Sequence, residues 1–426
     1  MGTALFSFCD NRLVNQEESP SIVLSYDHAA SVVRRQAGEL RALARGRGVE
    51  SIALAAAAGR VLAEPVVADR DQPPFPRATR DGFACRSVDL QAEGMRVVGQ
   101  LRAGEAWTLG AIRPGEAVEI MTGAAVPPGA DCVVMVEHAV GKDEFVTVAD
   151  GRQVAAGENI VPAGAEARAG DVVVPAGRRM GVPEIAAAAA CGAAELPVFG
   201  KPRVAILATG DELVEVTEKP LAHQIRNSNS YSLAAQVRAA GGEPVARPIV
   251  RDDKAATEKA IREALECDLI LLTGGVSMGK FDFVEQALVA LDAEFYFTGA
   301  KIQPGKPVVF GKLDKRYFLG LPGNPISTMV TFALFASPLV RALGGEEHAG
   351  PHFGMARLEE DLEVKAGLTR FLPAVVESSF RGARVRRIGW QGSGDLAAAA
   401  KANAFLVVPE TAERLAAGEI VTVMEI

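Results

Sequence analysis

The sequence has 426 residues, with 45 Lys or Arg against 53 Asp or Glu, so its formal net charge is −8. At roughly 150 residues per domain it predicts about three domains, and 49% hydrophobic residues exclude an intrinsically disordered chain. The acidic balance argues against nucleic acid as a partner, because non-specific binding depends on Lys and Arg neutralising phosphates.

The five cysteines are scattered and show no Cys-x-x-Cys spacing. This pattern excludes a zinc ribbon, disfavours a disulfide framework and predicts a reducing, cytoplasmic compartment. No uncharged apolar run reaches the length of about 18 residues that a membrane-spanning helix needs, so no membrane association is expected. The first 19 residues carry four charged side chains and lack the apolar core of a signal peptide.

Residues 25–199 predict N-terminal mixed and β domains. Apolar residues recur at steps of three or four over 27–45, which predicts a helix with Asp27 as a candidate cap. Short apolar runs between Gly- and Pro-rich turns then predict strands at 95–101, 117–123, 131–138 and 145–148. An Ala-rich helix is expected after Pro183.

Residues 201–345 predict a central α/β domain. Strands are expected at 203–210, 244–250, 268–275 and 318–325, and helices at 230–240, 252–266, 283–291 and 327–343. Such alternation is typical of a mostly parallel sheet covered on both faces. The short strands expected at 371–378, 383–389, 405–410 and 420–426 predict a small C-terminal β domain over 351–426.

Polar residues follow two of the α/β strands, at the sheet edge where ligands bind in open α/β folds. Asp211 and Glu212 suit a hard cation such as Mg²⁺, or Asp211 merely caps a turn. Gly274 and Gly275 form a tight loop whose amides can face an anion, or an ordinary strand-to-helix connection, and Asp282 follows.

The third segment, 302–327, carries Lys306 beside a turn and then Pro-Gly-Asn-Pro at 322–325. The helix expected next has free N–H groups and a positive dipole end, which suit an oxyanion. Ser327 either caps that helix or contacts the ligand. None of the three segments matches a Walker loop or a dinucleotide fingerprint.

The ordered motifs of the chain together resemble the molybdopterin molybdenumtransferases (MoeA type), which are similar to the C-terminal part of gephyrin. They are TRDGFA at 79–84, MTGAAVPPGAD at 121–131, GENI at 157–160, TGDEL at 209–213, RNSN at 226–229, RDD at 251–253, TGGVS at 273–277, PGKP at 304–307 and GLPGNP at 320–325. The resemblance covers residues 25–426, nearly the whole chain.

The resemblance implies four domains: domain I at 25–70 and 150–200, an inserted small β domain II at 71–149, the molybdopterin-binding α/β domain III at 201–345, and the β domain IV at 351–426. It implies a homodimer whose cleft joins the α/β domain of one chain with the small β domain of the other. The implied reaction inserts molybdenum from molybdate into adenylylated molybdopterin and releases AMP, with Mg²⁺ in support. The enzyme that adenylylates molybdopterin is an expected partner.

The resemblance also implies site residues. Its catalytic candidates are Asp81, Thr122, Glu212, Asp252 and Asp282. Its substrate-binding candidates are Gly210, Asp211, Asn229, Gly274, Gly275, Ser277, Lys306, Gly323, Asn324 and Ser327. Glu212 and Asp282 would hold Mg²⁺, and molybdate would contact Lys306, Ser327, Arg370 and Ser393.

The sequence departs from the family pattern at four places: Arg80 and Phe83 stand where relatives often carry Met and Tyr, Asn159 where they often carry Asp, and Gln303 where Lys can occur. Two other functions are alternatives for this sequence. An enzyme that adenylylates molybdopterin would not need the long N-terminal half. A non-catalytic dimeric scaffold would not need the acids at 81, 212 and 282. Molybdate and tungstate, both tetrahedral dianions, stay alternatives.

Overall fold

The structure is a computed structural model that describes residues 22–90, 94–149, 152–275 and 283–426. The chain divides into two compact units. The first, which we call the α/β unit, contains the described residues of Met1–Glu50, Gly59–Ala63 and Pro197–Ile426. The second, named the N-terminal β unit, contains Ser51–Ala58 and Glu64–Leu196.

The α/β unit is built on a six-stranded sheet with the order β17-β14-β18-β23-β22-β19. Its strands are β14 (Arg203–Ala208), β17 (Glu243–Ala246), β18 (Leu269–Thr273), β19 (Glu294–Phe297), β22 (Val309–Leu313) and β23 (Arg316–Leu321). The first four strands in this order run parallel, and β22 runs antiparallel to both of its neighbours, β23 and β19. The sheet is therefore mostly parallel, as predicted.

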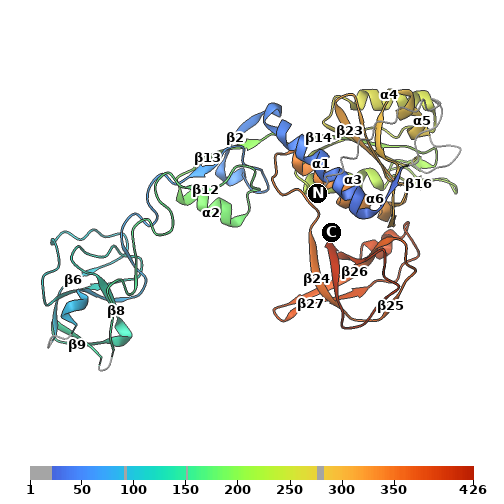
Figure 1. The fold of residues 1–426 in the computed structure, drawn as a ribbon. Helices are drawn as coiled ribbons and strands as arrows, with labels where there is room; N and C mark the ends of the chain where they lie inside the picture. Colours follow the sequence, from blue (N-terminus) through green and yellow to red (C-terminus); the bar gives the residue numbers. More distant parts are fainter. Residues whose placement is uncertain (1–21, 91–93, 150–151, 276–282) are drawn as a thin grey trace, which may run out of the picture. The chain divides into compact units, whose positions relative to one another are not determined.

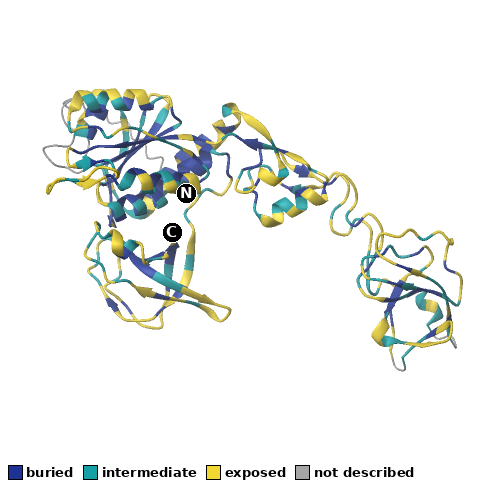
Figure 2. Cartoon of the chain, turned by 180° about the vertical axis from the view of Figure 1, so that it is seen from behind, coloured by how far each residue is buried: buried dark blue, intermediate teal, exposed yellow. Residues whose placement is uncertain are grey.

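Alternate residues of the strands enter two separate cores, because successive side chains of a strand point to opposite faces. Val204 and Ile206 belong to the core that also contains side chains of α1 (Tyr26–Leu43), α3 (Asn229–Ala239) and α6 (Pro325–Thr331). Ala205 and Leu207 pack with α4 (Lys254–Ala264) and α5 (Phe283–Ala290). Figure 1 shows these helix sets on opposite faces of the sheet, and Figure 2 shows exposed outer faces on α4 and α5, whereas α6 has no exposed residue.

Helix α1 (Tyr26–Leu43) belongs to the core of this unit although the first strand of the sheet, β14, does not begin until Arg203. Its buried stripe includes Ala29, Val33 and Leu40, and the helix packs against α7. Asp27 is not the cap: the N-cap is Ser25, whose hydroxyl accepts a hydrogen bond from the His28 N–H at 3.4 Å. The short strand β1 (Val23–Leu24) precedes it.

The helix predicted at 327–343 begins two residues earlier and is not regular. It consists of α6 (Pro325–Thr331), a π-helical turn (Phe332–Ala336) and α7 (Ser337–Leu343). Pro338 explains the irregularity, because proline has no N–H to donate to the preceding turn and its ring crowds that turn. In the part of the chain that the structure describes, this segment is long and apolar enough to cross a membrane, but 83% of it is buried, as in a core helix.

Two further predicted elements have different ends. The strand expected at 244–250 ends at Ala246, and Pro248, which cannot donate to a ladder, follows. The helix expected at 252–266 begins at Lys254, because the Asp253 carboxylate caps it by accepting from the Ala256 N–H at 2.7 Å. Asp252 is therefore outside the helix.

The C-terminal part of the unit forms a second sheet with the order β21-β26-β27-β24-β30-β28. Its strands are β21 (Ile302–Gln303), β24 (Phe353–Leu358), β26 (Thr369–Ser379), β27 (Gly382–Arg387), β28 (Ala404–Val408) and β30 (Ile420–Glu425). Since β28 also pairs with β26, five of them close into a small barrel. Strand β24 was missing from the predicted elements.

The N-terminal β unit contains another six-stranded sheet, with the order β8-β5-β7-β6-β10-β9. Its strands are β5 (Gly82–Cys85), β6 (Met95–Leu101), β7 (Glu116–Ile120), β8 (Cys132–Met135), β9 (Ala139–Lys142) and β10 (Phe145–Val148). The Ala-rich helix α2 (Val182–Ala190) begins just before Pro183. The predicted strands of this region agree with β6, β7, β8 and β10.

Candidate functional site

The carboxyl ends of three neighbouring parallel strands meet at one level of the α/β sheet. Ala208 of β14 pairs with Thr273 of β18, and Thr273 pairs with Leu321 of β23. The chain leaves each strand at this row in a loop rich in glycine or proline. The segments at 209–213, 273–275 and 322–325 are therefore brought together, as expected for the edge of a parallel sheet.

A cavity of about 780 Å³ opens between these loops. Eight of the predicted site residues line it, namely Gly210, Glu212, Asn229, Asp252, Gly274, Gly275, Gly323 and Asn324. Its volume lies within the range of about 300–1,000 Å³ that is usual for small-molecule sites.

Gly274 shows why glycine ends the central strand. Its φ of +92° lies in the left-handed region, and a Cβ added there would lie 2.4 Å from the Thr209 carbonyl oxygen. Any side chain would therefore force two strand-end loops apart. Gly274 makes possible the close approach that shapes this wall of the cavity.

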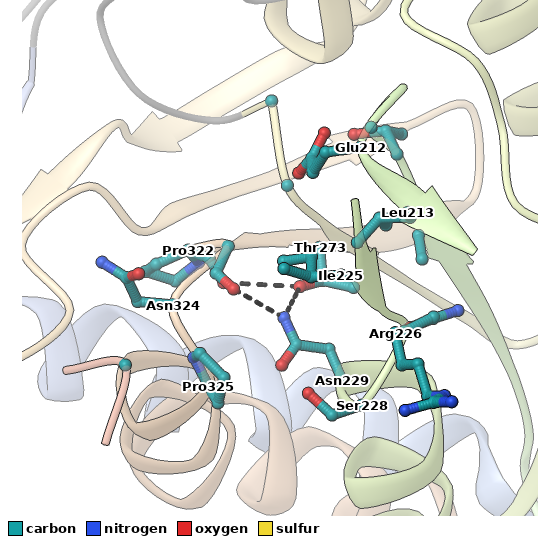
Figure 3. A pocket seen from close by; sticks show the side chains of 18 of the residues that line it. Glu212, Leu213, Ile225, Arg226, Ser228, Asn229, Thr273, Pro322, Asn324 and Pro325 are labelled. Atoms are coloured by element: carbon teal, nitrogen blue, oxygen red, sulfur yellow. Dashed lines mark hydrogen bonds between the residues drawn. The ribbon is translucent and has the colours of Figure 1, made fainter. Parts of the chain in front are cut away.

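Asn229, the first residue of α3, connects two of these loops at the floor of the cavity (Figure 3). Its Nδ2 donates to Thr273 Oγ1 at 2.9 Å and to the Gly323 carbonyl at 2.8 Å. Reversing the amide would place its oxygen against the Gly323 carbonyl, so the hydrogen-bond network fixes its orientation. Its Oδ1 is buried and has no hydrogen-bond partner in the described part of the chain, as is also true of Thr209 Oγ1.

Charge in the cavity is mixed. Glu212 and Asp252 supply carboxylates, and Arg226 supplies a guanidinium. Asp211 does not line the cavity. It exchanges hydrogen bonds with Asp252, the N–H of each donating to the carboxylate of the other at 3.4 Å.

Several lining residues were missing from the predicted site residues, among them Thr209, Arg226 and Ser228. The RNSN motif at 226–229 was a signal for two of them, because it stands immediately before helix α3. Gly394 and Leu396 also line the cavity. They come from the C-terminal part of the unit, and no sequence pattern indicated them.

The four predicted molybdate ligands lie outside the cavity lining. Lys306 is exposed, whereas Ser327 is only 4% exposed within α6. Arg370 pairs with Gln303 across β26 and β21. The carbonyl oxygen of Ser393 accepts a hydrogen bond from the Ile326 N–H at 2.9 Å.

This last contact changes the expectation that the first amides of α6 are free for an oxyanion. Pro325 has no N–H, and the Ile326 N–H is taken by Ser393. The Thr328 N–H already donates to the Asn324 carbonyl at 3.0 Å. The N-terminus of α6 therefore offers fewer open donors than an ordinary helix.

Asp81 and Thr122 meet in the N-terminal β unit. Asp81 precedes β5 and Thr122 follows the antiparallel strand β7, so both stand at one edge of the sheet. Asp81 Oδ1 accepts hydrogen bonds from the Thr122 hydroxyl and N–H, both at 2.7 Å. These bonds lower the pKa of the Asp81 carboxyl below its usual value, and the bond from the Thr122 hydroxyl has a larger effect than the bond from the Thr122 amide.

Asn159 has a structural role in the same unit. Its Nδ2 donates to the Val133 carbonyl at 2.9 Å, and its φ of +60° is one that Asn adopts more readily than most residues. An aspartate could not donate this hydrogen bond.

Ser277 and Asp282 lie outside the described residues, so their predicted roles stay predictions. Among the residues that are described, no group of three or more His, Cys, Asp or Glu is placed to hold a metal ion. Mg²⁺ is commonly held by one or two carboxylates together with substrate phosphates, and the pair Glu212 and Asp252 fits that mode.

Three family models match consecutive parts of the chain. The MoeA N-terminal region (domains I and II) matches residues 24–192, a probable molybdopterin binding domain matches residues 205–342, and the MoeA C-terminal region (domain IV) matches residues 355–426.

Similar proteins agree with these matches. A molybdopterin molybdenumtransferase of Staphylococcus aureus is 34% identical, over 88% of this chain and 90% of its own. One from Nostoc sp. is 33% identical, over 88% of each. A crystal structure of the molybdopterin biosynthesis MoeA protein from Pyrococcus horikoshii is 29% identical with a TM-score of 0.77, and covers 95% of this chain and all of that one.

Proposed function

The chain belongs to the family of molybdopterin molybdenumtransferases, enzymes of molybdenum cofactor biosynthesis, and we propose that it inserts molybdenum from molybdate into adenylylated molybdopterin with release of AMP. The observation that carries this proposal is the cavity at the carboxyl ends of β14, β18 and β23. It has the volume for a nucleotide-sized ligand, with fixed polar groups at its floor and acids at its rim.

The acids support the phosphate chemistry. Glu212 and Asp252, with Asp282 as a further candidate, would hold Mg²⁺ against the phosphates of the adenylylated substrate. When bound, the cation supplies Lewis-acid polarisation of the phosphorus and neutralises charge on the departing AMP. The Arg226 guanidinium supplies a fixed donor fork suited to a phosphate.

The base of the cavity supports ligand orientation. The Asn229 side-chain amide ties Thr273 to the Gly323 carbonyl, and so would fix the shape of the surface on which the ligand rests. Gly210 and Gly274 let the chain pass close to the Glu212 side chain and to the Thr209 carbonyl, so a side chain at either position would displace groups that line the cavity.

Molybdate is a substrate and would be held by the cations beside α6. Lys306 and Arg370 supply positive charge, with Ser327 and Ser393 as further contacts. Because Ser393 occupies the Ile326 amide, most of the attraction for a dianion would come from the two side-chain cations. Tungstate would be attracted in the same way.

Asp81 and Thr122 are proposed as the catalytic contribution of the N-terminal β unit, and the protein as a cytoplasmic homodimer. Their hydrogen-bonded pair keeps the carboxylate ionised. The four-domain division given by the family resemblance is part of this proposal. Light scattering at micromolar protein concentration tests the dimer, and a monomer would contradict it.

The reaction is tested by incubating the protein with adenylylated molybdopterin, molybdate and Mg²⁺ and measuring AMP. We expect AMP release by the wild type, its loss in Glu212→Gln, and unchanged release in Glu263→Gln, an exposed acid of α4. Consumption of ATP with bare molybdopterin would instead indicate an adenylyltransferase. Turnover in neither assay would favour a non-catalytic scaffold function. Unaltered AMP release by Glu212→Gln would refute the role of that acid.

A further inference from the structure

Residues 391–396 of the C-terminal part of the α/β unit form a short strap beside the cavity. Gly394 and Leu396 of this 391–396 strap line the cavity itself. The carbonyl of Ser393 accepts the Ile326 N–H at 2.9 Å and so joins the strap to the first turn of α6. The short helix α8 (Leu396–Ala399) continues from the strap and packs on α6.

One carboxylate fixes the shape of the strap. Asp395 Oδ2 accepts from the Gln391 N–H and Oδ1 accepts from the Ala398 N–H, each at 3.0 Å. The Asp395 N–H in turn donates to the Gly392 carbonyl at 3.0 Å. The amide of Gln391 and then that of Ala398 hold the pKa of Asp395 below its usual value, so the carboxylate is ionised near neutral pH.

The ends of the strap are anchored in the main core. Trp390 before it and Ala399 after it pack against the apolar cluster that contains side chains of α6 and α7. With both ends held by packing, the conformation of the residues between them depends on hydrogen bonds. The carboxylate of Asp395 makes two of these bonds, and they close the strap from both sides.

We propose that Asp395 is a positioning residue for the reaction: it holds the 391–396 strap against the first turn of α6, so that the C-terminal part of the chain forms one wall of the ligand cavity. The effect of Asp395 on the KM for adenylylated molybdopterin rests on the proposed function. Its structural consequence, the occupied Ile326 amide, does not depend on that function.

A purely local role for Asp395 would be the capping of α8. The geometry shows that Asp395 does more than cap α8. One of its two bonds comes from the Gln391 N–H, outside the helix, and the strap reaches the cavity lining. Asp361 offers the matched comparison within the same barrel. Its Oδ1 accepts from the Ala417 N–H and its Oδ2 from Arg414, but it does not line the cavity.

The first test needs only the protein. Hydrogen exchange at the Ile326 amide is compared in the wild type, Asp395→Ala and Asp361→Ala. Loss of the strap should expose this amide, so we expect exchange about tenfold faster or more in Asp395→Ala and unchanged in Asp361→Ala. Unchanged protection of Ile326 in Asp395→Ala would overturn the inference.

The second test uses the proposed reaction with Mg²⁺ and molybdate present. We expect Asp395→Ala to raise KM for adenylylated molybdopterin by about tenfold, with kcat within about twofold of the wild type. Asp395→Asn should recover part of the effect, because its amide oxygen still accepts one of the two N–H groups. Asp361→Ala should leave KM unchanged.

The two failures are distinguishable. A wild type without turnover would refute the proposed function, while the exchange measurement would still decide the role of Asp395. Wild-type turnover with KM unchanged in Asp395→Ala, or raised equally in Asp361→Ala, would refute the positioning role and leave the proposed function standing.

Discussion

Replacing Asn229 with Ala should lower stability and ligand affinity together. The substitution removes two hydrogen bonds, to Thr273 Oγ1 and to the Gly323 carbonyl. Each bond contributes about 0.5–1.5 kcal/mol net. Gly323 is exposed and its carbonyl can turn to water, so the expected loss lies near the lower part of the sum, about 1–2 kcal/mol. The melting temperature should fall by about 2–8 °C.

Gln236 provides the control for this prediction, because it is on the same helix and also donates its amide to a backbone carbonyl, that of Met329 at 3.1 Å. Its Oε1 is buried without a hydrogen-bond partner in the described part of the chain, like Asn229 Oδ1, but it does not line the cavity. Gln236→Ala should therefore cost about 1 kcal/mol and leave affinity unchanged.

The measurement is calorimetric titration with AMP, the proposed product, alongside thermal melts. We expect Asn229→Ala to bind AMP about tenfold more weakly than the wild type, equivalent to about 1.4 kcal/mol. Equal affinity of Asn229→Ala and wild type would show that the bonds of this amide do not shape the ligand site. Equal weakening in Gln236→Ala would show that only the stability of α3 matters.

Three other changes have defined outcomes. Because the pKa of Asp81 is lowered in the folded protein, its ionised form stabilises the N-terminal β unit above about pH 4, and this stabilisation is lost as the pH falls through the lowered pKa. Asp81→Asn should therefore remove this part of the pH dependence of the melting temperature. An unchanged pH profile in Asp81→Asn would contradict this prediction. Arg341→Met should lower the free energy of unfolding by about 3–5 kcal/mol in urea titrations, because it removes one side of the buried Arg341–Glu346 ion pair. A loss below about 1 kcal/mol, the range of an exposed ion pair, would refute this prediction. Gly274→Ala should destabilise more than Gly418→Ala, since both have positive φ but only the first would clash; equal melting temperatures would disprove the close approach.

The elements of the α/β sheet could be predicted because their signals are local. Continuous apolar runs followed by glycine indicated β14 and β18, and their parallel pairing brought the loops after them to one edge. The site could be located for the same reason. Gly210, Glu212 and Gly274 follow those strands and line the cavity.

Other features depend on contacts that leave no local pattern. The hydrogen bond between the Ile326 N–H and the Ser393 carbonyl joins two backbone groups, so no residue type in the sequence predicts it. Ser327 could be expected to face a ligand or to cap the helix. In the structure Asn324 is the N-cap, and Ser327 is within α6 and buried. Its helical phase decides this, and that phase depends on where the helix begins.

The sequence does not indicate strand β24, because few of its positions are buried. Only Ala356 and Leu358 of its six residues are buried, so the alternation that signals a strand is weak. The packing of α1 in the α/β unit could not be predicted from the sequence either. Its apolar stripe predicts that one face is covered, but the sequence pattern does not name the covering surface.

The remote partner of α1 has a consequence for synthesis on the ribosome. The helix emerges early, yet α7, against which it packs, follows about 300 residues later; at about 5–20 residues per second this is a delay of roughly 15–60 s. During that time the stripe with Ala29, Val33 and Leu40 has no permanent cover. The nascent chain is therefore expected to need a chaperone's protection at its beginning, even though the finished protein hides that surface completely.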